Sequence, residues 1–402
     1  MPAPVKTVFN TAFYNRILNT NGPANFDIWD GLGDAGGTLS VSSTINRRTG
    51  GFSLDVDKNA PATSTLYRRK DFQNASNKWA GRFYIFFQKM PNIKMRLFGL
   101  DDSLSVVNGL RFSVDSSAFR TEWGTFASSP APNVIVTGTW YRIDFKCDTS
   151  ANAFKTDWMI DGVSQPTYIF TGTAGTQNQI TFGVVTSSSG TCRVNYADAI
   201  FSQTYEDYPI GAGMGWALLP NSVITGSWLT PTNFQEDDTT AIDQNSWNRL
   251  DEWPPSTGST SDYIKQTTIM STGYIPFGIQ DRQDSGLGII NGVQAFLGYT
   301  SSGTLTNTGG AIVRRLDGTE VGIFGSTTGR ADYSDGNIND WFFAMTQVDK
   351  PPTGGWTTNE INGLGFRIGY STDVSPQPFW GALLLEYDVS IPSPYRAAVV
   401  GG

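Results

Sequence analysis

Histidine is absent from this chain of 402 residues, and cysteine occurs only twice, at Cys147 and Cys192. The absence of histidine removes the commonest general base and the commonest transition-metal ligand of proteins. It therefore excludes a Ser-His-Asp triad and any zinc site that contains histidine. Two thiols are also too few for a disulfide framework or a four-cysteine metal site. We expect no metal, no cofactor and no catalytic residue. The two cysteines are predicted to be free in the core, with one cross-strand disulfide as the alternative.

Charge is also scarce, because Asp, Glu, Lys and Arg together make up only 16% of the sequence. The formal net charge is −8, with a pI of about 4.7. These values argue against a nucleic-acid partner, since neutralising phosphates needs clustered lysine and arginine. The densest basic spots before the midpoint, at 47–48 and 68–70, are interpreted as solvated strand ends.

Long apolar runs are missing as well. The sequence has no stretch of about 18 apolar residues, so no membrane-spanning helix is expected. Residues 1–7 lack the basic and then apolar pattern of a signal peptide. We therefore expect no membrane insertion. We also expect synthesis in the cytosol, or export by a route that the sequence does not reveal.

Glycine and aromatic residues are abundant instead, with 44 glycines and 13% aromatic residues. Together with alternating apolar and polar positions, this composition is typical of an all-β protein with many turns. Two strand-rich blocks flank segment 205–213 (YEDYPIGAG), whose proline and glycines favour a hinge. The predicted fold is all-β, with two β-sandwich (jelly-roll) domains joined by a short Pro/Gly linker. The predicted parts are an N-terminal arm at 1–25, which joins the first sheet or packs on a neighbour, a first sandwich at 26–206, the linker at 207–215 and a second sandwich at 216–402.

Several strands of the first block can be predicted in detail. Segment 140–147 (WYRIDFKC) alternates, which places Tyr141, Ile143, Phe145 and Cys147 inward and the charged residues between them outward. Segment 83–87 (FYIFF) is apolar throughout, as expected of a central strand covered on both faces. Asn108-Gly109 within 104–114 predicts a hairpin turn, and Asp161-Gly162 predicts another turn.

The first block resembles the laminin-G/concanavalin-A-like jelly roll. The resemblance rests on an opening RTGGFSL at 48–54, WYRIDF at 140–145, WMIDG at 158–162 and a closing NYADAI at 195–200. Many members of that family carry an Asp-Asp pair in the closing strand, of which only Asp198 is present here. The resemblance implies a jelly roll over roughly residues 25–206.

The chemistry of the first block favours binding over catalysis. Retaining glycosidases need two carboxyl groups about 5 Å apart, and no Glu-x-Asp-x-Glu run is present. The nearest approaches, Asp101-Asp102 and Asp55/Asp57, are interpreted as a solvated loop and an outward strand face. Trp79 and Trp123 lie beside polar turns and are candidates for stacking on a sugar, with a place at the rim of the core as the alternative.

The second block resembles the C-terminal half of tailed-bacteriophage virion proteins. The resemblance rests on the YPIG linker, on WNRLDEWPP at 247–255, on DYI at 262–264 and on a late strand pair at 356–369. It carries over Asp251, Glu252, Trp253 and Tyr263 as candidate binding residues, with turn capping and packing between sheets as the alternative. An acidic patch at 236–238 offers oxygen ligands for a hard cation, but it lacks the spacing of a calcium loop, so a solvated loop is expected.

The two resemblances imply a non-enzymatic virion structural protein, either a minor tail protein or a capsid accessory (decoration) protein. Such a protein docks on the particle and presents a lectin-like domain. Its expected partners are other virion proteins in a homo-oligomer or symmetric array, and its expected location is the virion, assembled in the host cytoplasm. The first alternative is an adhesin that binds a host cell-surface glycan, which an exposed aromatic cluster beside polar side chains on the first domain would indicate. The second is a glycoside hydrolase.

Overall fold

The computed structural model describes most of the chain. The described residues are 7–11, 13, 29, 31–61, 63–102, 105–115, 117–123, 126–127, 131, 134–172, 175–224, 234–236, 243–251, 263–267, 275–284, 288–301, 311–314, 319–323, 342–348, 355–369 and 378–390.

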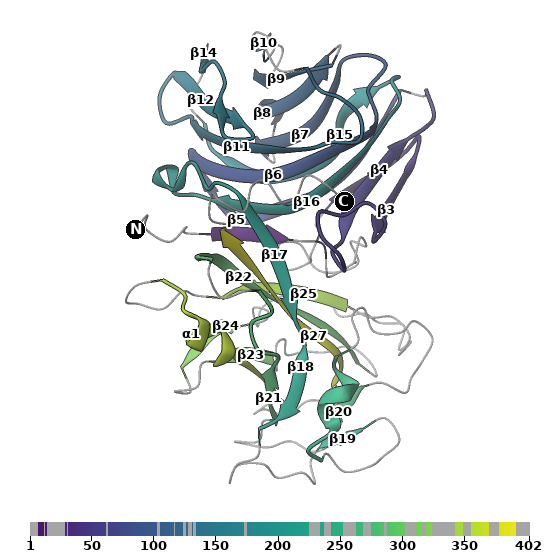
Figure 1. Ribbon diagram of the computed structural model, residues 1–402, viewed down its shortest axis with the longest axis vertical. Coiled ribbons are helices and arrows are strands. Elements are labelled where there is room, and N and C mark those ends of the chain that lie inside the picture. The colour runs from purple at the N-terminus through teal and green to yellow at the C-terminus, as the bar shows by residue number, and fades with distance from the viewer. Residues whose placement is uncertain are drawn as a thin grey trace.

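The first half of the chain forms two antiparallel sheets, drawn in the upper part of Figure 1. Sheet 1 has nine strands. In order they are β13 (Val163–Ser164), β12 (Ala153–Ile160), β11 (Trp140–Asp148), β6 (Lys78–Lys89), β16 (Cys192–Ser202), β4 (Ser53–Lys58) and β3 (Thr38–Ser42), with β1 (Thr7–Thr11) on β16 and β14 (Tyr168–Thr171) on β12. Sheet 2 has seven strands. Its order is β10 (Phe126–Ala127), β9 (Ala118–Trp123), β8 (Ser105–Asp115), β7 (Met95–Asp102), β15 (Gln177–Ser188), β5 (Ser64–Ser76) and β2 (Gly31–Asp34).

The second half forms two further antiparallel sheets, drawn in the lower part of Figure 1. Sheet 3 orders β19 (Phe234–Glu236), β20 (Ile264–Gln266), β27 (Pro378–Ser390), β22 (Ile290–Ser301) and β25 (Phe342–Gln347), with β17 (Gly213–Leu218) on β27. Sheet 4 orders β18 (Pro220–Val223), β21 (Ile275–Ile279), β26 (Gly365–Ile368), β23 (Ala311–Arg314) and β24 (Glu320–Ile323). The described helices are short: η1 (Tyr205–Asp207), η3 (Ser246–Arg249) and α1 (Thr358–Asn362). The prediction of an all-β protein built from β-sandwiches is confirmed.

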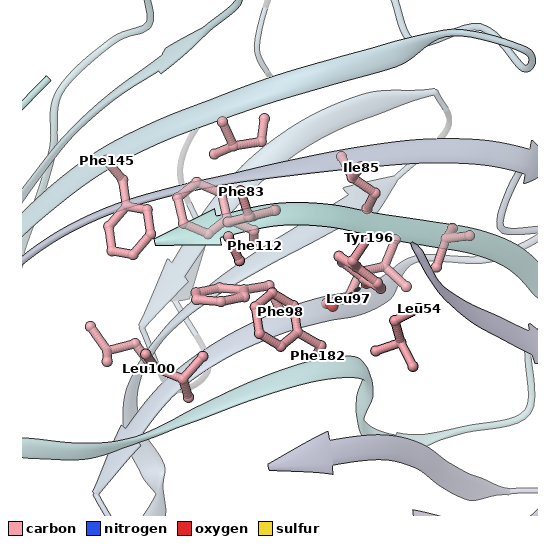
Figure 2. Packing of buried hydrophobic residues seen from close by; sticks show 14 of the residues in the cluster. Leu54, Phe83, Ile85, Leu97, Phe98, Leu100, Phe112, Phe145, Phe182 and Tyr196 are labelled. Atoms are coloured by element: carbon pink, nitrogen blue, oxygen red, sulfur yellow. Dashed lines mark hydrogen bonds between the residues drawn. The ribbon is translucent and has the colours of Figure 1, made fainter. Parts of the chain in front are cut away.

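Aromatic rings fill the space between sheets 1 and 2 (Figure 2). Phe83 of sheet 1 stacks on Phe98 of sheet 2 with ring centroids 4.6 Å apart. Phe112 and Phe182 of sheet 2 pack edge-to-face on the same Phe83 ring. Truncating such a ring costs about 3–5 kcal/mol, so this cluster is a major source of the stability of the first sandwich.

The alternation predicted for 140–147 is confirmed, because Ile143, Phe145 and Cys147 point into the core. Segment 83–87 lies in β6 between β11 and β16, as predicted for a central strand. The prediction that both of its faces are covered is wrong at Phe86, which points outward and is only partly buried. Asp144 points outward but is also buried, because the chain folds over it and the Gly211 N–H donates to its carboxylate at 2.8 Å.

One of the two predicted turns is wrong. β8 runs unbroken through Asn108-Gly109 and pairs with β7 and β9, so no hairpin turn occurs there. The Asp161-Gly162 turn is confirmed, since both residues adopt left-handed backbone angles, with φ of 51° and 83°. Glycine is needed at position 109 for another reason, a close contact with an ion pair on the outer face of sheet 2.

The N-terminal strand β1 joins sheet 1 by pairing with β16. Its Phe9 ring packs edge-to-face on Trp29 and stacks on Phe201. Figure 1 shows β1 between the two halves of the molecule, next to β22. The apolar cluster of the first half continues into the second half through Phe296 and Leu384. The two sandwiches therefore share a continuous apolar junction.

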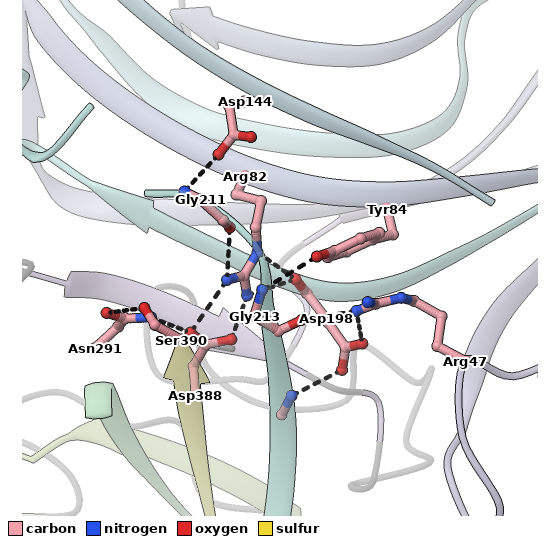
Figure 3. A network of polar contacts seen from close by, with 11 residues as sticks. Arg47, Arg82, Tyr84, Asp144, Asp198, Gly211, Gly213, Asn291, Asp388 and Ser390 are labelled. Carbon is pink, nitrogen blue, oxygen red and sulfur yellow. Dashed lines mark hydrogen bonds and ion pairs between the residues drawn. The ribbon is translucent and has the colours of Figure 1, made fainter. Parts of the chain in front are cut away.

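The junction also holds a network of buried charges, centred on Arg82 of β6 (Figure 3). Its guanidinium forms an ion pair with Asp388 of β27 and donates to the Asp198 carbonyl at 3.0 Å. Asn291 of β22 completes the Asp388 site with a 2.6 Å hydrogen bond. A side chain at Gly213 would collide with the Arg82 guanidinium. The segment predicted as a hinge is therefore held from both sides.

A second ion pair of the network starts from a β-bulge in β16. Asp198 lies at this bulge with a φ of 43°, a conformation that few residues other than glycine adopt readily. The bulge directs its carboxylate to Arg47 and to the Gly215 N–H, at 2.9 Å from the latter. Arg48 lies 3.7 Å from the centre of the Trp216 ring. The interpretation of 47–48 as a solvated strand end is therefore wrong, because these arginines join the two halves.

Candidate functional site

The two tryptophans proposed for sugar stacking are buried, with exposed fractions of 0% for Trp79 and 1% for Trp123. Both lie on the inward faces of their strands and belong to the first core. Their indole N–H groups donate to the Ser76 carbonyl at 3.0 Å and to the Thr156 hydroxyl at 3.2 Å. The prediction of exposed rings is wrong at both positions, since alternation in β6 and β9 directs them inward.

The candidates carried over from the virion resemblance are described only in part. Tyr263 is buried and packs edge-to-face on Phe379, with ring centroids 4.9 Å apart. This contact fits the packing alternative. Asp251 is half-buried at the end of η3. Glu252 and Trp253 lie outside the described residues.

The acidic patch at 236–238 is described only at its first residue. Glu236 is buried and accepts hydrogen bonds from the Ser246 hydroxyl at 2.6 Å and from Arg249 at 2.9 Å. This residue is therefore a partner of η3 and not part of a solvated loop. Within the described ranges, no group of three or more acidic or cysteine side chains is placed to hold a metal ion. No helix in the same ranges is long and apolar enough to cross a membrane.

An aromatic pair lies on the outer face of sheet 1. Trp140 of β11 is the cross-strand neighbour of Phe86 of β6. Their ring centroids are 5.3 Å apart, with the planes tilted by 46°. Both side chains are only partly buried, whereas the alternate residues Ile85 and Phe87 are in the core. Two adjacent rings are thus held at the surface by the strand register.

Amide and carboxylate groups adjoin these rings on the same face. Asn195 of β16 is opposite Phe86 on its other side, and Asp55 of β4 is opposite Asn195. Gln88 follows Phe86 by two positions, so it points to the same face. Its amide donates to the side-chain amide oxygen Oδ1 of Asn195 at 2.7 Å and to the Asp55 carboxylate at 3.5 Å. We call this set, Trp140, Phe86, Gln88, Asn195 and Asp55, the aromatic–amide row.

Hydrogen bonds fix the polar end of the aromatic–amide row. Asp55 is buried, and Arg193 binds its carboxylate through two nitrogens, at 2.6 and 3.2 Å. Asn195 donates to the Ser53 hydroxyl at 3.0 Å. Asp55 therefore belongs to an ordered polar chain, and the Gln88 amide beside the rings is held in one orientation. The register of β4, β6, β11 and β16 assembles this row from four strands, so no local sequence motif marks it.

A second polar face lies on the opposite side of the first sandwich, on sheet 2. Arg111 and Ser113 alternate with the core residues Leu110, Phe112 and Val114, so they point outward. Arg111 forms an ion pair with Asp101 of β7, which is buried. A Cβ atom at Gly109 would meet both partners of this pair, the Asp101 carboxylate at 2.1 Å and Arg111 at 2.5 Å. This pair is the reason for glycine at position 109, and it excludes the solvated loop expected at Asp101.

Glu122 of β9 is the second buried acid on this face. Its carboxylate accepts from Arg96 at 2.6 Å, from Ser113 at 2.6 Å and from Lys94 at 2.8 Å. Burial alone would raise the pKa of Glu122, but these hydrogen bonds lower it below its ordinary value. The group is therefore ionised near neutral pH. A general acid of a glycosidase needs a raised pKa, so Glu122 is unsuited to that role.

The same face continues to the other edge of sheet 2. Arg69 of β5 lies flat over Gly31, where a Cβ atom would approach its guanidinium to 2.8 Å. Tyr67 lies in the same way over Gly33, at 2.7 Å. Arg69 forms an ion pair with Asp71 at 2.9 Å. We call the outward residues of sheet 2 from Glu122 to Arg69 the ion-pair face.

No protein-family model matches the chain, and no curated protein matches it. Among solved structures, similarity was found to a protein described as "Cellulose induced protein, Cip1", at 14% identity and a TM-score of 0.37, covering 49% of this chain and 97% of that one. Similarity was also found to a sialidase, at 14% identity and a TM-score of 0.35, covering 51% of this chain and 19% of the sialidase. A heptameric SAP-like pentraxin from Limulus polyphemus is 11% identical at a TM-score of 0.28, covering 35% of this chain and 72% of the pentraxin. At TM-scores this low the similarities support no conclusion about activity or ligand.

The virion role that the sequence resemblance implies stays a prediction. It concerns the location and partners of the protein, whereas ligand binding depends on the chemistry of the described surface of the first sandwich. The aromatic–amide row is the arrangement that fits the glycan-binding alternative.

Proposed function

We propose that the protein is a non-enzymatic glycan-binding protein and that the aromatic–amide row of sheet 1 binds the sugar. The observation that supports this most directly is the half-buried pair of Trp140 and Phe86 beside the amide of Gln88. A pyranose ring has an apolar face of C–H groups, which suits the electron-rich face of an aromatic ring. Its rim of hydroxyl groups suits the half-buried amide of Gln88, which the buried Asn195 and Asp55 hold in place.

The row is also preorganised, which reduces the entropy lost on binding. The rings are fixed by strand pairing, and Gln88 is held by Asn195 and Asp55. No reaction is part of this proposal. A location on a virus particle, with the first sandwich presented to a host surface, is compatible with it and would make the protein an adhesin.

The proposal can be tested by electrophoresis of the full chain in native gels cast with neutral polysaccharides: hydroxyethylcellulose, glycol chitin and galactomannan. We expect at least one of these to retard the wild-type protein. Trp140→Ala should reduce the affinity at least about tenfold, since central aromatic contacts commonly contribute more than about 1.4 kcal/mol to binding. Gln88→Ala should reduce it about fivefold, since a hydrogen bond contributes about 1 kcal/mol. Trp247→Ala is the matched control, because Trp247 is also half-buried but lies in the second half.

Thermal unfolding of each variant shows whether it is folded, and Gln88→Ala keeps the test valid if Trp140→Ala does not fold. Equal retardation of wild type, Trp140→Ala and Gln88→Ala would contradict the proposal. So would a wild-type protein that none of the three polysaccharides retards.

A further inference from the structure

At two places on the ion-pair face, the positively charged side chains are more exposed to solvent than the carboxylates that they bind. In the Glu122 cluster the carboxylate side chain is 0% exposed, whereas Lys94 is 42% exposed and Arg96 is 23% exposed. At the other edge of sheet 2, Arg69 is 31% exposed and its partner Asp71 is 19% exposed. At these two places the cationic groups lie nearer the solvent than the carboxylates, whereas Asp101 and Asp115 are slightly more exposed than their partners Arg111 and Arg120. A ligand that approaches the Glu122 cluster or Arg69 therefore meets cations first.

Arg111 does not add free charge to this face. Burial and the nearby charge of Arg96 lower the pKa of Arg111, but its ion pair with the adjacent Asp101 carboxylate compensates the positive charge. The surplus of positive charge lies at the Glu122 cluster, where Lys94 and Arg96 share one carboxylate. This surplus is local, since the whole chain carries a net charge of −8.

The spacing of the cations indicates an extended ligand. The Glu122 cluster is on β9, β8 and β7, and Arg69 is on β5, with β15 between them. Four strand spacings separate β9 from β5, which amounts to about 19 Å. Between the two ends lie Gln179 and Thr181 of β15, whose polar side chains are buried, so the contacts with a ligand would be made at the two ends. A single small anion cannot reach both ends, whereas a polymer with repeated anionic groups can.

We infer that the ion-pair face binds an anionic polysaccharide, with Lys94 and Arg96 contacting acidic groups at one end and Arg69 at the other. The side chains already lie in place. Arg69 is supported on Gly31, and Arg96 is fixed on Glu122 at 2.6 Å. Arginine suits this role because its planar guanidinium can hold a carboxylate with one edge while other N–H groups face the solvent. This site is on the opposite sheet from the aromatic–amide row and does not depend on it.

The test uses the full chain in native gels cast with polygalacturonate, dextran sulfate or uncharged dextran. We expect one or both polyanions to retard the wild-type protein. Uncharged dextran should not bind to the ion-pair face. Comparison of the two polyanions distinguishes carboxylate from sulfate as the preferred group. Arg69→Gln and Lys94→Gln should each weaken polyanion binding about tenfold, in line with the loss of one charge-assisted hydrogen bond. Retardation should also weaken as salt is added.

Lys155→Gln is the matched control, because it removes one exposed positive charge from sheet 1. If Arg69→Gln and Lys94→Gln bind the polyanions no more weakly than Lys155→Gln does, the inference is wrong. It is also wrong if neither polyanion retards the wild-type protein. Trp140→Ala should leave polyanion binding unchanged, so failure of this inference and failure of the neutral-glycan proposal give different results.

Discussion

Individual side chains of this protein show how burial controls chemistry. Cys147 and Cys192 are both free and buried, as predicted from the sequence. They lie on β11 and β16, which are separated by β6, so a bridge across adjacent strands is not formed. Burial raises the pKa of the Cys147 thiol above its ordinary value and that of the Cys192 thiol to about 12. Reactive thiolate is therefore scarce at both positions.

We predict that neither cysteine reacts with iodoacetamide at pH 8 while the protein is folded, because only the thiolate is nucleophilic. Both should react after unfolding in guanidinium chloride. Mass spectrometry of the native and unfolded samples measures the number of added groups. Rapid labelling of the native protein, or a mass two hydrogens too low before reduction, would contradict this prediction.

Glu122 links the ion-pair face to stability at low pH. Its folded pKa is below the ordinary value of glutamate, which is about 4.3. Stability from its ionised form is therefore fully present above pH 4.3 and is lost as the pH falls through the folded pKa. At pH 7 we expect Glu122→Gln to lower the free energy of unfolding by about 2 kcal/mol, because charge-assisted hydrogen bonds are lost.

The difference between Glu122→Gln and wild type should shrink as the pH is lowered below 4.3, which urea unfolding at a series of pH values measures. Glu206→Gln, at an exposed position in η1, should match wild type throughout. A constant difference between pH 7 and pH 3 would show that Glu122 does not act through its charge.

At the scale of strands, the sequence contains enough information for the fold class but not for the sites. Alternation placed Ile143 and Phe145 in the core, and their burial confirms it. The same alternation along β6 also predicts an inward Trp79, because Trp79 shares a face with Phe83. Asn108-Gly109 misled because glycine in a strand has two causes, a turn or a close approach of another group. At position 109 the cause is the close approach of the Asp101–Arg111 ion pair, and this is evident only from the pairing of β7 with β8.

The aromatic–amide row could not be found from local sequence for a similar reason. Trp140 and Phe86 are 54 positions apart and meet through the register of β11 and β6. Asn195 and Asp55 are 140 positions apart and meet through the register of β16 and β4. Cross-strand neighbours of this kind depend on strand order, which alternation within one strand does not determine.

Gly109 provides a test of these strand contacts. We predict that Gly109→Ala lowers the free energy of unfolding by about 1–3 kcal/mol, the usual cost of overpacking. The added Cβ would lie 2.1 Å from Asp101 and 2.5 Å from the Leu100 carbonyl oxygen. Gly175→Ala is the control, because nothing lies within 4 Å of a Cβ there. Equal stability of the two variants in urea unfolding would contradict the described position of the ion pair.

At the scale of the whole molecule, Arg82 and Asp388 join the two sandwiches. Burial alone would lower the pKa of Arg82, but Asp388 raises it above its ordinary value, so the pair stays charged. Removing one partner of a buried pair leaves an uncompensated charge and typically costs 3–5 kcal/mol. Replacing both by apolar residues avoids that cost.

We therefore predict that Arg82→Met lowers the free energy of unfolding by about 3–5 kcal/mol and that Arg82→Met/Asp388→Leu recovers a large part of the loss. Calorimetry of the full chain should show the two halves of Arg82→Met unfolding at more separate temperatures than in wild type. If the double variant is as unstable as the sum of the single variants, the pair does not act as a unit.

The buried pair also affects how the chain can fold during translation. Arg82 is made 306 residues before Asp388, and β1 must wait for β16 as its pairing partner. When all strands of sheets 1 and 2 have been synthesised, Arg82 still lacks its Asp388 partner. The apolar residues that later contact Phe296 and Leu384 are also still uncovered. Until β27 emerges, these contacts of the first sandwich with the second half are incomplete. Completion of the contacts of the first sandwich therefore depends on β27, the last of the described strands in chain order.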